Sequence, residues 1–293
     1  MTTAGAGAAT LRSRASERLP RVRLVGTVGA IAAQGGGEIQ LERTGAALVD
    51  AGVDARPWSP WEDGYTGFDC LHLFGSAPEQ LPIAEAARRA GVAVVLSPIA
   101  WFDVASRWHS HLPLAQRVTG VAKAACRRYG PQQRDWRWRL YHGVDRLLPN
   151  SRAEAEQLER WFGVPGNKIH VVPNGADSRF AQAAPELFRQ RFGEFRFVLC
   201  VGRVEPRKNQ LALIRALRTT GTRLVLIGDP VAGHESYYQR CREEAGDVRF
   251  IGGIAHDDPL LASAYAAADA VVLVSWFETP GLAALEAGMS GTP

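Results

Sequence analysis

Short apolar runs alternate with helix-length segments along almost the whole chain, and this alternation restricts the fold more than any other feature. In the first half, strand-like runs occupy 21–26, 53–58, 70–74, 92–96 and 145–149, with helical patterns over 39–51, 82–90 and 152–162. In the second half, strand-like runs at 197–201, 223–227, 248–251 and 270–275 alternate with helical patterns at 210–217, 237–245, 258–268 and 282–289. Such alternation predicts an α/β protein with doubly wound parallel sheets, whose ligands bind beyond the carboxyl ends of the strands.

The length and composition fit two domains of ordinary size. The 293 residues are 46% hydrophobic, which is enough for one large core or two ordinary cores. We predict a disordered leader over 1–19, a first domain over 20–180 and a second domain over 181–293. The sequence contains no apolar run long enough to span a bilayer and no signal peptide. Its four cysteines form no C-x-x-C pair, so neither a disulfide framework nor a zinc site is predicted. Unpaired cysteines are typical of a protein in a reducing cytoplasm.

Two carboxylates follow the last strand-like run, 270–275. Glu278 lies in the loop after this run, and Pro280 then suits the first turn of a helix. Glu278 is therefore expected at the carboxyl end of a strand, beside a helix N-terminus whose free N–H groups suit an anion. Glu286 lies about one turn inside this helix, where it can face the same crevice. The arrangement fits a sugar attached to a phosphate.

A basic turn follows the first strand-like run of the second half. The run 197–201 ends at Gly202, where the backbone can approach a ligand closely, and Arg203 and Lys208 flank the turn into the helix 210–217. Arginine offers a planar fork of donors and lysine a compact charge, so the pair suits a pyrophosphate.

Four elements in this order resemble those of the retaining GT-B glycosyltransferases of family 4. They are the glycine loop Gly35–Gly37, the run Pro173-Asn174-Gly175-x-Asp177, the run Gly202-Arg203-x4-Lys208-Asn209, and Glu278 and Glu286 with seven residues between them. The resemblance implies the GT-B fold, in which two Rossmann-like domains face a central cleft. Gly291-Thr292-Pro293 stands where members of the family continue. We therefore expect a truncated second domain that exposes apolar side chains and is less stable and less active than a longer chain.

The resemblance also implies an activity and the residues that carry it. The expected enzyme is of the hexosyltransferase type, acts in polysaccharide biosynthesis, and transfers a sugar from a nucleotide-diphosphate sugar to a glycan, lipid-linked or small-molecule acceptor with retention of configuration. Neither a cofactor nor a metal is expected. In matching motifs the first glutamate lies near the sugar hydroxyls and the second accepts hydrogen bonds from the ribose. The implied catalytic residues are Glu278, Arg203 and Lys208, and the implied donor-binding residues are Gly36, Gly37, Gly202, Gly252, Thr279, Gly281, Leu282 and Glu286.

The sequence departs from the family pattern after the run 92–96. Family members often have a histidine there, whereas this chain has Ser97-Pro98-Ile99-Ala100-Trp101. His109 and His111 are the nearest substitutes, and a lone histidine is more often a surface or core residue.

The segment 117–146 is strongly basic and also contains Trp136, Trp138 and Tyr141. It suits an anionic membrane surface, an anionic acceptor, single-stranded nucleic acid, or simply a solvated helical face. The net charge of +4 is too small to imply nucleic acid by itself, and no nucleic-acid partner is expected. We expect a cytoplasmic protein, with attachment to the inner face of the membrane left open.

Three other functions fit parts of the sequence. A sugar-nucleotide epimerase or a phosphorylase could share the two-domain fold, and a non-catalytic nucleotide-sugar-binding protein would keep the affinity without the reaction. A module that binds membranes or nucleic acid would depend on the basic segment alone.

Overall fold

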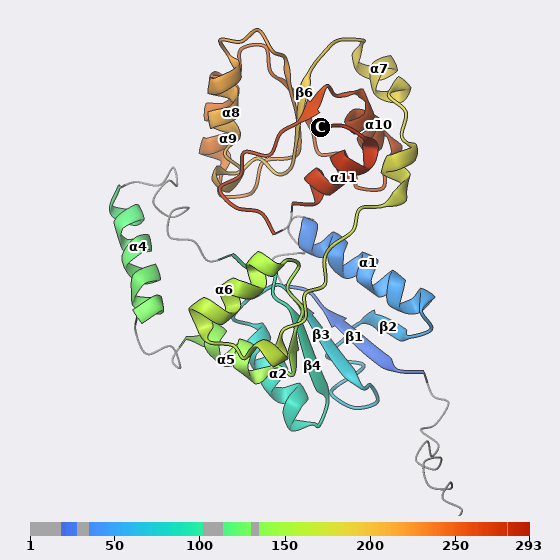
Figure 1. Ribbon diagram of the computed structural model, residues 1–293, viewed down its shortest axis with the longest axis vertical. Coiled ribbons are helices and arrows are strands. Elements are labelled where there is room, and N and C mark those ends of the chain that lie inside the picture. The colour runs from blue at the N-terminus through green and yellow to red at the C-terminus, as the bar shows by residue number, and fades with distance from the viewer. Residues whose placement is uncertain (1–18, 28–34, 102–113, 130–134, 280) are drawn as a thin grey trace, which may run out of the picture.

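The computed structural model describes residues 19–27, 35–101, 114–129, 135–279 and 281–293. Every strand pairing within the two described sheets is parallel, which confirms the predicted doubly wound α/β class. The two sheets lie in two lobes that follow one another along the chain (Figure 1). The predicted leader 1–19 lies almost wholly outside the described residues.

The first sheet has the strand order β2-β1-β3-β4-β5. Its strands are β1 Arg21–Val25, β2 Asp54–Pro57, β3 Cys70–Phe74, β4 Ala93–Ser97 and β5 Arg146–Leu147. The helices of this lobe are α1 Gly36–Asp50, α2 Gln80–Arg89, α4 Leu114–Tyr129, α5 Trp136–Gly143 and α6 Arg152–Phe162. Residues of α2, α5 and α6 pack with β3 and β4 to form the core of this lobe, while α1 contacts β1 and β2.

The second sheet has the strand order β8-β7-β6-β9. Its strands are β6 Val198–Val201, β7 Leu224–Ile227, β8 Arg249–Gly252 and β9 Ala270–Val271, and its helices are α7 Glu186–Phe192, α8 Gln210–Leu217, α9 Glu235–Glu243, α10 Pro259–Ala267 and α11 Leu282–Ser290. Successive residues of β7 point into two different cores: Leu226 packs with α8 and α9, and Ile227 with α7 and α10. This central strand is therefore buried on both faces.

Three short 3₁₀ helices complete the described elements: η3 Gly166–Lys168, η4 Ser178–Gln182 and η5 Pro206–Lys208. The domain boundary predicted between 180 and 181 falls inside η4 and stays a prediction. Phe180 of η4 is fully buried in the core of the second lobe, against Tyr265.

The last strand differs from the prediction. The whole run 270–275 is predicted to be a strand, but only Ala270–Val271 pairs with β6, and all six side chains are half-buried. The physical reason is its place at an edge of the described sheet. On the side away from β6, the backbone N–H of Val271 donates to the carbonyl of Pro293 instead of to a further strand.

The glycine loop also differs from the prediction. Gly36 and Gly37 form the first turn of α1, which begins three residues earlier than the helix predicted over 39–51. Gly35 is the N-cap, and its N–H donates to the Glu38 carboxylate at 2.7 Å, so a capping interaction starts the helix here.

The basic segment divides into two parts with different environments. Helix α4 lies to one side of the first lobe (Figure 1). Trp136, Trp138 and Tyr141, in contrast, lie on α5: Tyr141 is fully buried, and Trp136 and Trp138 pack against the first core. The core therefore accounts for the fully buried Tyr141, whereas Trp136 and Trp138 stay half-buried and attachment to a membrane stays a prediction. None of the described helices is both long and apolar enough to cross a bilayer.

Candidate functional site

The loops after β6 and β9 are joined by backbone and side-chain contacts. The two strands are parallel neighbours, so their carboxyl ends meet at the same edge of the sheet. The N–H of Trp276 donates to the carbonyl of Arg207 at 3.0 Å, and the Asn209 amide donates to the carbonyl of Val274 at 3.3 Å. These bonds hold the basic turn predicted after β6 against the acidic loop predicted after β9.

Lys208 and Glu278 form an ion pair at the centre of this contact. Lys208 Nζ lies 2.5 Å from Glu278 Oε1, and the Ser275 hydroxyl donates to the same oxygen at 2.6 Å. Both charged side chains are mostly covered, with 16% of Lys208 and 21% of Glu278 exposed. Two of the three predicted catalytic residues are thus brought together, and each fixes the position of the other.

Two further arginines surround this pair. The Arg207 guanidinium bonds to Glu205 at 2.7 Å, lies 4.0 Å from Glu278 Oε2 and packs over the Phe277 ring. Arg203, the third predicted catalytic residue, lies 3.8 Å from Glu205. Arg203, Arg207 and Lys208 thus bring three cationic side chains to one loop cluster, and their N–H groups suit an anionic ligand. Sequence reasoning missed Arg207 and Glu205, although both lie inside the Gly202–Asn209 run.

Positive φ angles, and in one case close backbone packing, explain two of the glycines at the ends of the strands. Gly202 and Gly228 have φ angles of 142° and 147°, which only glycine adopts readily. A Cβ atom added to Gly228 would collide with the carbonyl of Gly202, so β6 and β7 can end this close together only without a side chain.

The turn at Gly252, a predicted donor-binding residue, already uses part of its backbone. The carbonyl of Gly252 accepts from the N–H of Gly228 at 2.8 Å, and the N–H of Gly253 donates to the Asp229 carboxylate at 2.7 Å. Sequence reasoning did not single out Asp229, which fixes this turn.

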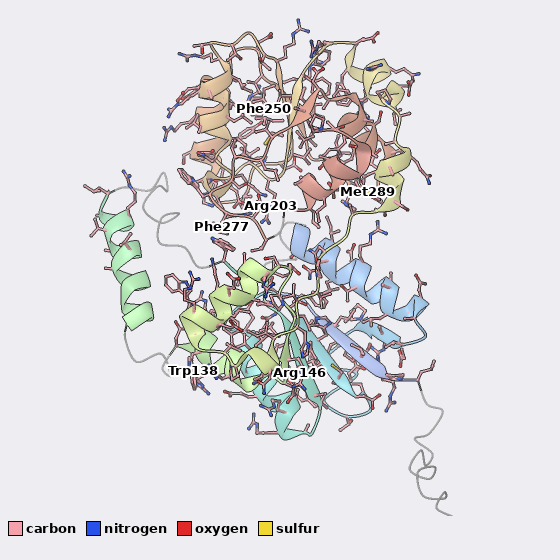
Figure 2. The ribbon with its side chains drawn as sticks, viewed as in Figure 1. Trp138, Arg146, Arg203, Phe250, Phe277 and Met289 are labelled. Carbon is pink, nitrogen blue, oxygen red and sulfur yellow. The ribbon has the colours of Figure 1, made fainter. Side chains whose placement is uncertain are left out.

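The first lobe reaches the site through the start of α1. A Cβ atom added to Gly35 would lie 3.4 Å from the Arg203 guanidinium carbon, and one added to Gly36 would lie 3.4 Å from Leu282 Cδ1. One added to Gly37 would lie 3.5 Å from Ile99. Figure 2 shows Arg203 and Phe277 at the junction of the two lobes. The N-terminal end of α1 therefore lies against Arg203 and Leu282 of the second lobe.

The loop after Glu278 leads directly into α11. Gly281 is the N-cap of this helix, with a φ of 82°, and a Cβ atom there would lie 3.3 Å from that of Glu278. Thr279 and Leu282 are half-buried on either side of this turn. Pro280, expected to start the helix, lies outside the described residues.

Glu286 has partners that the sequence did not reveal. Its side chain is buried, Oε1 lies 2.9 Å from His256 Nε2, and Oε2 accepts from the Tyr265 hydroxyl at 2.6 Å. Both oxygens of this predicted ribose-binding carboxylate are therefore already held by the protein. No local sequence pattern predicts these partners, because they lie 30 and 21 residues away from Glu286 along the chain.

The position that lacks the family histidine has an unusual backbone. Ile99 adopts a φ of 45°, and the next residue, Ala100, donates its N–H to the Glu154 carboxylate at 2.7 Å. Glu154 is fully buried, also accepts from the N–H of Asn150 at 2.8 Å, and has its pKa raised by burial. His109 and His111 lie outside the described residues. His72 is buried in β3 and bonded to Ser97, so it belongs to the sheet core.

No group of three or more potential metal-ligating side chains occurs among the residues that the structure describes. The expectation that no metal takes part stays a prediction.

Two family models match the chain, one in each half. Residues 34–180 match the model described as Glycosyltransferase Family 4, and residues 196–293 match the model described as Glycosyl transferases group 1. The same division into two halves appears in the two sheets of the structure.

Curated relatives share about a third of their residues with the matched part of the chain. The D-inositol 3-phosphate glycosyltransferase of Acidothermus cellulolyticus is 32% identical over 51% of this chain and 37% of the relative. The mannosylfructose-phosphate synthase of Agrobacterium fabrum is 30% identical over 53% of this chain and 38% of the relative. The matched segments thus span well under two thirds of these relatives.

Solved structures with the same fold cover nearly the whole chain. The structure of HepE from Anabaena in complex with UDP-glucose superposes with a TM-score of 0.63, at 18% identity, over 94% of this chain and 79% of that one. WaaG, described as a glycosyltransferase involved in lipopolysaccharide biosynthesis, superposes with a TM-score of 0.57 at 15% identity, over 94% and 80% of the two chains.

Proposed function

Because the chain belongs to glycosyltransferase family 4 and has the GT-B fold, we propose that it transfers a hexose from a nucleotide-diphosphate sugar to an acceptor hydroxyl. The names of two relatives support this reaction class, since they describe glycosyl transfer to, or synthesis of, a phosphorylated compound. The complex of HepE with UDP-glucose supports a nucleotide sugar as the donor.

The observation that carries the proposal is the Lys208–Glu278 pair with Arg203 and Arg207 around it. Breaking the bond between the sugar and the diphosphate places negative charge on the phosphates and positive charge on the sugar ring. Lys208 and Arg203 are prearranged cations that stabilise the phosphate charge without reorganising during the reaction. The Glu278 carboxylate holds Lys208 in place and offers its remaining lone pairs to sugar hydroxyls.

The N-terminal end of α1 closes the other side of this site. Gly35 and Gly36 approach Arg203 and Leu282 without side chains, so the free N–H groups of the first helical turn can contact the donor phosphates. The proposal includes donor contacts from Gly36, Gly37, Gly202, Gly252, Thr279, Gly281, Leu282 and Glu286. Retention of configuration is part of the proposal, and neither carboxylate is assigned as a covalent nucleophile.

The acceptor belongs to the first lobe, and phosphorylated small molecules are the first class to test. The names of the two relatives above motivate this choice. A glycan or a lipid-linked acceptor is the alternative, in which case cationic residues of 117–146 would hold the protein at an anionic membrane surface. Exposed Lys123, Arg139 and Arg146 support that attachment, whereas Tyr141 of α5 is fully buried and does not contribute to it.

The experiment is a nucleoside-diphosphate release assay with UDP-, GDP- and ADP-sugars, each with and without sugar phosphates, glycans and lipid phosphates. Release that requires an acceptor and yields a glycosylated product supports the proposal. Interconversion of the donor sugar without an acceptor would identify an epimerase instead, and release that requires inorganic phosphate a phosphorylase. Binding of a nucleotide sugar without turnover under any of these conditions would identify a non-catalytic binder.

A further inference from the structure

A series of hydrogen bonds connects Arg179, in the segment 174–182 between the two lobes, to Glu286. The Arg179 guanidinium, in η4, lies 3.1 Å from His256 Nδ1 and also donates to the carbonyl of His256. The other ring nitrogen of His256 lies 2.9 Å from Glu286 Oε1. The imidazole therefore stands between a cation and a carboxylate, with one ring nitrogen facing each.

The chemistry of the two partners fixes where the ring proton lies. A guanidinium has only donors, so His256 Nδ1 accepts the hydrogen bond from Arg179 and carries no proton. The proton of the neutral ring then lies on Nε2, which donates to Glu286. Tyr265 donates to the other oxygen, and burial next to Glu286 raises the pKa of Tyr265 well above its usual value, so that this hydroxyl keeps its proton. The carboxylate is thus held by two donors.

The same series of hydrogen bonds and ion pairs extends into the first lobe. Asp177 accepts from the N–H of Arg179 at 3.0 Å and forms an ion pair with Arg43 of α1 at 3.1 Å. The segment that positions Arg179 is therefore anchored to the helix whose first turn faces the site. Contacts on both sides of the junction converge on His256.

We propose that His256 is a positioning residue for Glu286, and that Arg179 selects the Nε2–H tautomer that makes this possible. The inference rests on the proposed function, because Glu286 is the carboxylate assigned there to the nucleotide. A ring with its proton on Nδ1 would turn a lone pair towards Glu286 and repel the carboxylate. Arg179 thereby links the segment between the lobes to the orientation of a nucleotide-binding group.

Two conservative substitutions test the two hydrogen bonds of His256 one at a time, because each keeps one bond and removes the other. An asparagine amide places its polar atoms near the position of Nδ1, and a glutamine amide places them near Nε2. His256→Gln keeps a donor for Glu286, whereas His256→Asn keeps only the acceptor for Arg179. We expect His256→Asn to weaken the affinity for the best-binding of UDP, GDP and ADP by about ten-fold, the effect of losing a hydrogen bond to a charged group. His256→Gln should stay within about three-fold of wild type.

Equal losses in the two variants, with equal changes in melting temperature, would show that His256 only packs against Phe180 and would overturn the proposal. The matched control is His234→Asn, at the start of α9, which should leave the affinity unchanged.

A measurement without nucleotide tests the tautomer directly. Nitrogen-15 spectra of the histidine side chains of the ligand-free chain, assigned by comparison with His256→Gln, should show the proton on Nε2. Arg179→Met should abolish this selection. A proton on Nδ1 in the wild-type chain would overturn the inference, whichever nucleotide binds. If no nucleotide binds the wild type while the Nε2–H tautomer is present, the proposed function fails and the positioning of Glu286 by His256 stands.

Discussion

Lys208 and Glu278 lie 70 residues apart in the chain, yet Lys208 Nζ lies 2.5 Å from Glu278 Oε1. The contact is possible because β6 and β9 are parallel neighbours whose following loops share the hydrogen bonds of Trp276 and Asn209. A cation that is suited to a phosphate and a carboxylate that is suited to a sugar are thereby placed at one end of one sheet. Each of the predictions below tests a part of the structure that produces or surrounds this arrangement.

Gly228→Ala should lower the free energy of unfolding by about 2–4 kcal/mol, because the added Cβ collides with the carbonyl of Gly202 and the residue also has a positive φ. Urea denaturation measures the change. Gly233→Ala is the matched control: its φ of 83° is also positive, but no atom lies within 4 Å of the added Cβ. It should cost about 1–2 kcal/mol, for strain alone. Equal losses would show that the approach of β6 to β7 is not tight.

Glu154→Gln should destabilise the first lobe by about 1–3 kcal/mol, the cost of leaving a buried donor without its acceptor. The amide keeps one acceptor oxygen for the N–H of Ala100 or Asn150, but its NH₂ group faces the other. Denaturant unfolding provides the measurement, with Glu156→Gln on the exposed side of the same helix as control. A variant as stable as wild type would mean that these two N–H groups find other acceptors.

Because His72 is buried, we predict that the protein loses stability in mild acid. Burial lowers the pKa of His72 to about 4 from an ordinary value of 6.5, so the unfolded chain binds the proton more tightly than the folded chain. The contribution of the neutral His72 side chain to the free energy of unfolding is therefore complete above pH 6.5 and is lost as the pH falls towards 4. At 1.36 kcal/mol for each pKa unit, it amounts to about 3 kcal/mol.

The measurement is the free energy of unfolding between pH 4 and pH 7.5. His72→Gln should flatten this dependence, while His170→Gln, at an exposed position, should not. Parallel curves for His72→Gln and wild type would show that His72 is not a source of the acid sensitivity.

Replacing Arg134, Arg137 and Arg139 by Ser should reduce sedimentation with vesicles of anionic lipid and leave nucleotide affinity intact. Each basic residue near an anionic surface contributes about 1 kcal/mol. Arg139 is half-exposed and Arg137 packs over Trp136, while Arg134 lies outside the described residues. Vesicles of zwitterionic lipid and the same substitutions at Arg189, Arg191 and Arg196 of the second lobe are the controls. Unchanged sedimentation would leave the segment as a solvated surface.

The local elements of the fold could be predicted closely from the sequence. The predicted bounds of α6 and α8 coincide with those observed, because Ser151 caps one helix, Gly163 ends it, and the apolar periodicity of both is strong. The two parallel sheets follow from the alternation of strands and helices. The last strand was predicted too long because an apolar run does not reveal that its strand lies at a sheet edge.

The site could be predicted only where it is local in sequence. Arg203, Lys208 and Glu278 each follow a strand, so strand placement alone brings them to one edge of the sheet. The partners of Glu286 depend on how α10 and α11 pack, and no spacing rule contains that information. The packing of α5 could not be predicted for a similar reason, since tryptophan next to arginine is typical both of a membrane interface and of a helix that covers a core.

The most direct test of the donor site is a calorimetric titration of the wild-type chain and of the Arg203→Ala/Lys208→Ala variant with UDP, GDP and ADP. The structure predicts that one nucleoside diphosphate binds the wild type, and that the double variant binds it at least about 100-fold more weakly, because each of the two lost charge-assisted contacts costs about 1.5–3 kcal/mol. Its affinity should fall far more than its melting temperature, and Arg196→Ala, at the opposite end of β6, should bind like wild type. Equal affinity of the double variant and the wild type would contradict the assignment of this site to the donor phosphates.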